Sequence, residues 1–167
     1  MPTTYEPIAT TTLGTAASTI TFSSITSAYT DLRLIINWQS TSTAETNLFM
    51  TFNSDTGSNY SYTRLVGDGA SASSGRATSQ TSLFIGKQNA STTSVWRMNE
   101  IDIFSYAGST NKTYLESHAT DNNGGGFVYR FVGLWRSTSA INTISIFQSG
   151  SNLNAGTTAT LYGILRA

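Results

Sequence analysis

Cysteine is absent from this chain of 167 residues, and proline occurs only twice. The lack of cysteine excludes disulfides and thiolate metal sites, and it fits a protein made in a reducing compartment. Charged residues are also scarce, at 11% of the chain, against about 25% in a typical globular domain. No apolar run approaches the roughly 18 residues that a membrane-spanning helix requires, so we expect no membrane partner.

Basic residues are few and dispersed. Seven Arg and two Lys are spread singly along the chain, and the net charge is zero. A nucleic-acid-binding surface normally shows as a basic run or patch, so we expect no nucleic-acid partner. The first residues, MPTTYEPIATTTLG, lack the basic and apolar regions of a signal peptide, so we expect synthesis and folding in the cytoplasm.

Hydroxyl residues take the place of the missing charge, with 28 Thr and 24 Ser. Threonine suits the exposed face of a strand. Short alternating apolar segments, separated by Ser, Asn and Gly loops, predict an all-β, antiparallel, jelly-roll-like β-sandwich of about eight to ten strands. We expect one such domain over residues 18–167. Residues 1–17 are predicted to form an extended N-terminal arm, either frayed or reaching a neighbouring subunit.

The segment 127–147 is the most informative of the predicted strands. Apolar residues occupy both parities of its first half: Phe127, Tyr129, Phe131 and Trp135 on one, and Val128, Val132 and Leu134 on the other. A strand of this kind is buried on both faces or lies against a second subunit. We predict a hairpin whose second strand has a bulge or a late start after Ile141.

Two further predictions concern strand boundaries and phase. The small residues of 67–79 predict a long loop. Within 95–104, Trp96 and Met98 lie on one parity while Ile101 and Ile103 lie on the other. A bulge near Asn99 would bring all four to the same face.

Few residues suggest catalysis. His118 shares a strand face with Glu116 and Tyr114, and a strand-face or interface role is favoured over a general base. Glu100 and Asp102 lie about 7 Å apart on one strand, a spacing that resembles a hydrolase pair. Such pairs usually come from different strands in a deep cleft. If Glu116 on the next strand faces them across the hairpin, a cross-strand pair with Lys112 or Arg97 is favoured. We expect no catalytic residues.

Metal and phosphate sites are equally weak candidates. Residues 53–59, NSDTGSN, carry alternating oxygen ligands, but the twelfth position of a calcium loop would be Arg64, so a hairpin turn is favoured. Residues 121–126, DNNGGG, lack the Lys and Ser/Thr of a phosphate loop. We expect no metal and no cofactor.

Several segments nevertheless carry a resemblance: TYEPIATTTLG, ITFSSI, YTDLRLII, FNSDTGSNYSYTRL, GLWRSTSAINTISI and TLYGI. Together they resemble a family of small β-rich virion structural proteins of tailed bacteriophages, including cyanobacterial ones. The resemblance implies a capsid decoration or cement protein, or the tip of a fibre. It implies no catalytic residue.

On this resemblance we expect a non-enzymatic outer-capsid cement protein, located in the virion, that partners with itself as a homotrimer and with the major capsid protein. The expected contacts come from the arm and from the outward parity of the opening strand: Tyr5, Ile8, Leu13, Val128, Val132 and Leu134. The alternative is a fibre module that binds host glycan through Tyr60 and Tyr62. A hydrolase that uses Glu100 and Asp102 is the third interpretation.

Overall fold

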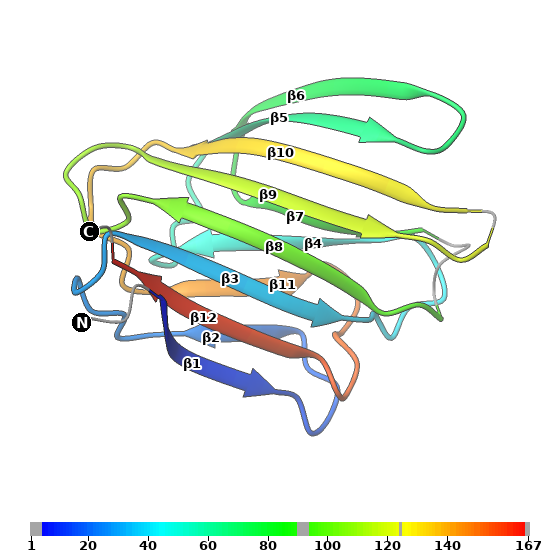
Figure 1. Cartoon of the computed structure of the whole chain (residues 1–167), viewed down its shortest axis with the longest axis horizontal. Coiled ribbons are helices and arrows are strands. Elements are labelled where there is room, and N and C mark those ends of the chain that lie inside the picture. The colour runs from blue at the N-terminus through cyan, green and yellow to red at the C-terminus, as the bar shows by residue number, and fades with distance from the viewer. Residues whose placement is uncertain (1–4, 90–93, 124, 166–167) are drawn as a thin grey trace.

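The computed structural model describes residues 5–89, 94–123 and 125–165, none of which is helical (Figure 1). Twelve strands account for most of them. The strands are β1 (Tyr5–Thr12), β2 (Thr19–Phe22), β3 (Asp31–Trp38), β4 (Thr46–Phe52), β5 (Tyr60–Gly67), β6 (Ala72–Gln80), β7 (Leu83–Gln88), β8 (Arg97–Phe104), β9 (Lys112–Thr120), β10 (Phe127–Trp135), β11 (Ile144–Gln148) and β12 (Thr158–Ile164).

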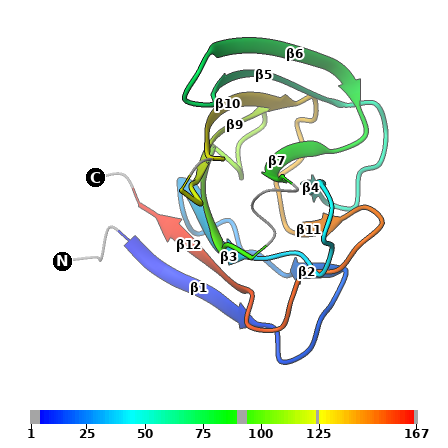
Figure 2. The same cartoon turned by 90° about the vertical axis from the view of Figure 1, so that its right-hand side faces the viewer.

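The strands form two sheets that face each other. The large sheet has the order β1-β12-β3-β8-β9-β10-β5-β6, and the small sheet has the order β2-β11-β4-β7. All pairings are antiparallel. Figure 2 shows the large sheet bending around the small one, so its outer face is convex. The predicted all-β antiparallel sandwich is confirmed, with twelve strands instead of eight to ten.

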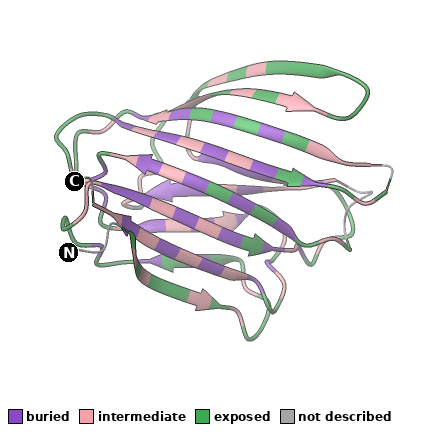
Figure 3. Cartoon of the chain, viewed as in Figure 1, coloured by how far each residue is buried: buried purple, intermediate pink, exposed green. Residues whose placement is uncertain are grey.

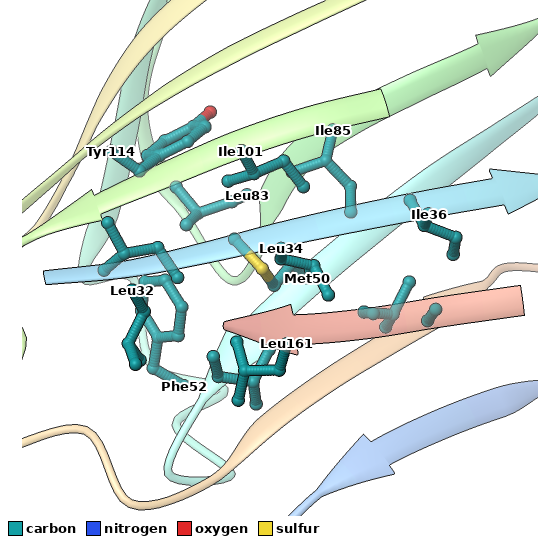
Figure 4. Packing of buried hydrophobic residues seen from close by; sticks show 14 of the residues in the cluster. Leu32, Leu34, Ile36, Met50, Phe52, Leu83, Ile85, Ile101, Tyr114 and Leu161 are labelled. Atoms are coloured by element: carbon teal, nitrogen blue, oxygen red, sulfur yellow. The ribbon is translucent and has the colours of Figure 1, made fainter. Parts of the chain in front are cut away.

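Side-chain alternation places the core between the sheets, and it shows as alternating colours along the strands in Figure 3. Leu32, Leu34 and Ile36 of β3 have no exposed surface and meet Met50 and Phe52 from the small sheet (Figure 4). Burying a side chain of this size contributes about 1.5 to 3 kcal/mol each. The core is therefore built by the inward parity of strands from both sheets.

The predicted hairpin over 127–147 is wrong. β10 lies in the large sheet between β9 and β5, whereas β11 lies in the small sheet between β2 and β4. The connection between them crosses the sandwich, and Ile141 is buried within it at 1% exposure. β11 starts only at Ile144, so the change of phase is a late strand start. The apolar pattern marks which face is inward but carries no information on which sheet a strand joins.

The loop predicted over 67–79 is also wrong, because β6 occupies Ala72–Gln80. β6 is an edge strand bonded only to β5, and most of its residues are exposed. Its small hydroxyl residues show no apolar alternation, so the ladder of backbone hydrogen bonds holds it in place. Sequence pattern alone does not detect a strand of this kind.

β8 runs without the predicted bulge near Asn99. Its register with β3 and with β9 is continuous. Ile101 and Ile103 are fully buried, whereas Trp96, just before the strand, and Met98 are 41% and 61% exposed. The two parities are two faces of a regular strand, and one of them presents apolar side chains to the outside.

The described part of the N-terminal segment, which begins at Tyr5, belongs to the large sheet. Tyr5–Thr12 is the edge strand β1, which pairs with β12 and shifts register between Pro7 and Ala9. Ile8 and Leu13 pack against the core. The ring of Tyr5 stacks on Tyr162 at a centroid distance of 4.6 Å.

A glycine in β10 provides a test of this packing. A Cβ added at Gly133 would lie 1.9 Å from Cε1 of Tyr114, whereas one added at Gly67 of the neighbouring strand would meet nothing within 4 Å. We expect Gly133→Ala to lower the free energy of unfolding by about 1 to 3 kcal/mol through overpacking. The control Gly67→Ala should change it by less than about 0.5 kcal/mol. Equal effects in denaturant titrations would contradict the packing described.

Candidate interaction surface

The outer face of the large sheet carries exposed apolar side chains. Met98, Val128, Val132 and Leu65 have 61%, 64%, 49% and 58% of their surface exposed. They come from β8 and β10, which flank β9, and from β5, which lies next to β10. Isolated exposed apolar residues are ordinary, but a continuous group marks a contact surface.

Strand register places these side chains in rows that cross β9. Ala119 of β9 pairs with Met98 on one side and with Val128 on the other. Four residues earlier on β9, Leu115 pairs with Val132. We name this group the apolar strip. Its members are Leu65, Met98, Leu115, Ala119, Val128 and Val132.

The structure places the predicted contact residues of β10 on the same face. Val128 and Val132 are exposed members of the apolar strip, and Leu134 lies half-buried beyond them, opposite Thr113. Leu134 and Val132 line a hollow of about 290 Å³ together with Tyr62. Of the other predicted contacts, Ile8 and Leu13 are partly buried against the core, and Tyr5 stacks on Tyr162 with 40% of its surface exposed.

A charged row crosses the apolar strip. Ser117 of β9 pairs with Glu100 on β8 and with Arg130 on β10, and Arg130 donates a hydrogen bond to the Ser117 hydroxyl. Both outer charges are accessible, since the Glu100 side chain is 46% exposed and Arg130 is classed as exposed. The row therefore has a negative end and a positive end, with a small polar residue between them.

Arg33 of β3 holds the two carboxylates that were weighed as a hydrolase pair. Its Nε and Nη2 donate to Asp102 at 2.6 and 2.9 Å, and its Nη1 lies 3.1 Å from Glu100. The hydrogen bonds to Asp102 raise the pKa of Arg33. Glu116 does not face this pair, because it points to the opposite side of the sheet and is fully buried.

Beneath the apolar strip lies a buried polar network. Glu116 Oε1 accepts a hydrogen bond from Asn99 Nδ2 at 3.0 Å and lies 2.9 Å from His118 Nδ1. Asn99 in turn accepts one from Trp38 Nε1 at 2.6 Å. The imidazole stacks on Tyr129 at 4.4 Å between centroids. Tyr114, Glu116 and His118 share one face, as predicted, and that face is the interior.

Burial governs the ionisation of this network. Desolvation raises the pKa of Glu116, although hydrogen bonds from His118 and Asn99 oppose the rise. Glu116 Oε2 and His118 Nε2 have no hydrogen-bond partner among the described residues. The hydrogen bonds from Trp38 to Asn99 and from Asn99 to Glu116 link β3, β8 and β9, and the stacking of His118 on Tyr129 adds β10.

The turn at 53–59 is built around Asp55. Its carboxylate accepts hydrogen bonds from Trp135 Nε1 at 2.7 Å, from the Gly57 amide at 2.8 Å, and from Asn59. Burial alone would raise the pKa of Asp55, but these hydrogen bonds outweigh it and lower the pKa. A turn is therefore correct but a hairpin is not, because β4 and β5 belong to different sheets. Within the described ranges, no three His, Cys, Asp or Glu side chains are grouped to hold a metal ion.

The two tyrosines weighed as glycan contacts are poorly placed for that role. Tyr60 is fully buried and its hydroxyl hydrogen-bonds the backbone of Phe52, so a surface glycan cannot reach it. Burial also raises the pKa of Tyr60 to about 12. Tyr62 is half-buried against Phe131. Tyr60 therefore does not fit the glycan contact expected of it.

Sequence reasoning missed Met98, Leu65 and Trp96 as surface residues. Their signal was present in the phase of the strand, since Met98 has the parity opposite to the buried isoleucines. Trp96 adjoins Phe127 and Val128 in a hollow of about 700 Å³ at one end of the face. The predicted bulge near Asn99 would have turned Trp96 and Met98 to the same face as the isoleucines, so they were not recognised as exposed.

Comparisons of the chain with protein-family models, with curated proteins and with solved structures found no match. No helix in the described part of the chain is long and apolar enough to cross a membrane.

Glu116 gives a pH-dependent prediction. Because its pKa is raised by folding, its stabilising contribution is complete below the unfolded pKa and is lost as pH rises through the folded pKa. We expect Glu116→Gln to gain stability relative to the original chain as the pH rises from about 4 into the range where the folded carboxyl ionises. Denaturant titrations across that range measure the difference.

The matched control is Thr113→Ser on the same strand as Glu116, at a half-buried position. The change removes no ionisable group, so its stability difference from the original chain should stay constant over the same pH range. A constant difference for Glu116→Gln as well would contradict the assigned role of burial.

Proposed function

We propose that this chain is a non-enzymatic structural protein of a bacteriophage particle, most of all an outer-capsid cement or decoration protein. The observation that carries the proposal is the apolar strip on the outer face of the large sheet. An exposed apolar surface rimmed by polar residues is the usual form of a protein contact. The sequence resemblance supplies the setting, a phage head with the major capsid protein as partner.

The proposed mechanism is adhesive. The side chains that could be taken for a hydrolase pair are already engaged with Arg33 on an open sheet face. The sheet offers a regular surface whose side chains are held by the buried network below. Covering it removes apolar area from water and favours the assembled particle by mass action.

The apolar strip is favoured over the N-terminal segment as the contact. Ile8 and Leu13 are partly buried against their own core, and Tyr5 stacks within its own chain. Met98 and Val128 have no such cover. The homotrimer expected from the resemblance belongs to the same proposal, as one way of placing this surface at a symmetry axis of the shell.

A second candidate function is recognition of host glycan. It is favoured by Trp96, which is 41% exposed beside the 700 Å³ hollow. Aromatic faces next to polar loops are suited to sugars, and Asp68 and Asp121 also line this hollow. Binding to a glycan array that is lost in Trp96→Ala would support this function over adhesion to the shell.

Co-sedimentation with phage heads that lack the protein tests the adhesive function. We expect the original chain to bind the heads and Val128→Lys to bind at least about tenfold more weakly, because an unpaired ammonium would be buried in the contact. The control is Thr21→Lys, at an exposed position of the small sheet. Failure of the original chain to bind, or equal binding by all three proteins, would refute the proposal.

A further inference from the structure

The residues on the outer face are arranged symmetrically on the two sides of β9. Ser117 has Glu100 on one side and Arg130 on the other, in register. In the adjacent row, Ala119 has Met98 on one side and Val128 on the other. In both rows, the residues of β8 and β10 lie on opposite sides of β9, one strand away from it. One row carries opposite charges and the other carries apolar side chains.

A two-fold axis parallel to β9 and above the sheet would bring these residues of two copies into complementary pairs. Such an axis places β8 of one copy over β10 of the other. Glu100 of each copy then faces Arg130 of the other, and Met98 faces Val128. Small residues, Ser117 and Ala119, meet themselves at the axis, where two sheets approach most closely.

The net charge of each side supports this pairing. On the β8 side, Arg33 neutralises one of the two carboxylates that it contacts, and one negative charge remains. On the β10 side, Arg130 hydrogen-bonds only to a neutral hydroxyl among the contacts described. Each half of the surface therefore attracts the opposite half of a second copy, whereas two identical halves would repel.

The next row is compatible with the same axis. It places Asp102 opposite Val132, but Asp102 is turned to β3 by its two hydrogen bonds with Arg33, and its side chain is only 20% exposed. The convex bend of the large sheet, visible in Figure 2, confines a face-to-face contact to the strands beside β9. These are the strands that carry most of the apolar strip.

We propose that a second copy of this chain covers the apolar strip, across a two-fold axis along β9 that pairs Glu100 of each copy with Arg130 of the other. The dimer rests on the proposed role of the outer face as the contact surface of the protein, and it names a second copy as the occupant of the strands beside β9, in place of the homotrimer expected from the resemblance. In a particle, such a dimer would occupy a local two-fold position.

Charge exchange in the full chain tests the dimer. Light scattering over a concentration series should give the original chain twice the mass of 17.9 kDa for one chain. Glu100→Lys and Arg130→Glu should each raise the dissociation constant by about 100-fold, because each replaces two opposite-charge contacts with two like-charge contacts. The double variant, and a one-to-one mixture of the two single variants, should both recover the dimer.

The recovery separates the pairing from any loss of folding, because both changes are present in the double variant. A monomeric original chain at every concentration, single variants that remain dimeric, or a double variant that stays monomeric would each overturn the dimer. Binding to phage heads is measured by co-sedimentation and is interpreted separately from dimer formation. A monomer that binds heads through Val128 would refute the dimer and keep the proposed function, whereas a dimer that binds no heads would do the reverse.

Discussion

The register of β9 against β8 and β10 is the constraint on which the rest of the structure depends. Each pairing runs without a shift over the length of the strands. Because side chains alternate, this register sends Glu116 and His118 into the sandwich and Leu115, Ser117 and Ala119 outward. A slip by one residue would exchange the two sets, placing charge in the core and destroying the outer rows.

The interior and the surface are therefore parts of one arrangement. Asn99, Glu116 and Trp38 tie neighbouring strands together from within, and the absence of a side chain at Gly133 makes room for the ring of Tyr114. These contacts fix the rows outside, where opposite charges and apolar side chains stand at equal offsets from β9. Such a surface is suited to adhesion, which needs a fixed shape and complementary charge but no reactive group.

Much of the fold was predictable from the alternation of apolar and polar residues, but few of the surface contacts were. The inward residues of β3 were predictable, because a strand with one apolar parity has a single buried face. The partner sheet of β11 and the existence of β6 were not, since both depend on pairings that leave no mark on local sequence. Val128 and Val132 were predicted as contacts from a two-sided strand, but Met98 was lost to an assumed bulge. The row of Glu100, Ser117 and Arg130 requires three strands in register, which a single sequence does not provide.

Oxidation of Met98 tests most directly whether the apolar strip is a covered contact. Met98 is 61% exposed in the single chain, whereas Met50 is fully buried and serves as the internal reference. Peroxide treatment followed by peptide mass spectrometry measures both. We expect Met98 to oxidise rapidly in dilute protein and slowly in concentrated protein and on the particle, with Met50 protected throughout. Equal rates for Met98 in all three samples would show that nothing covers this face and would contradict the central claim.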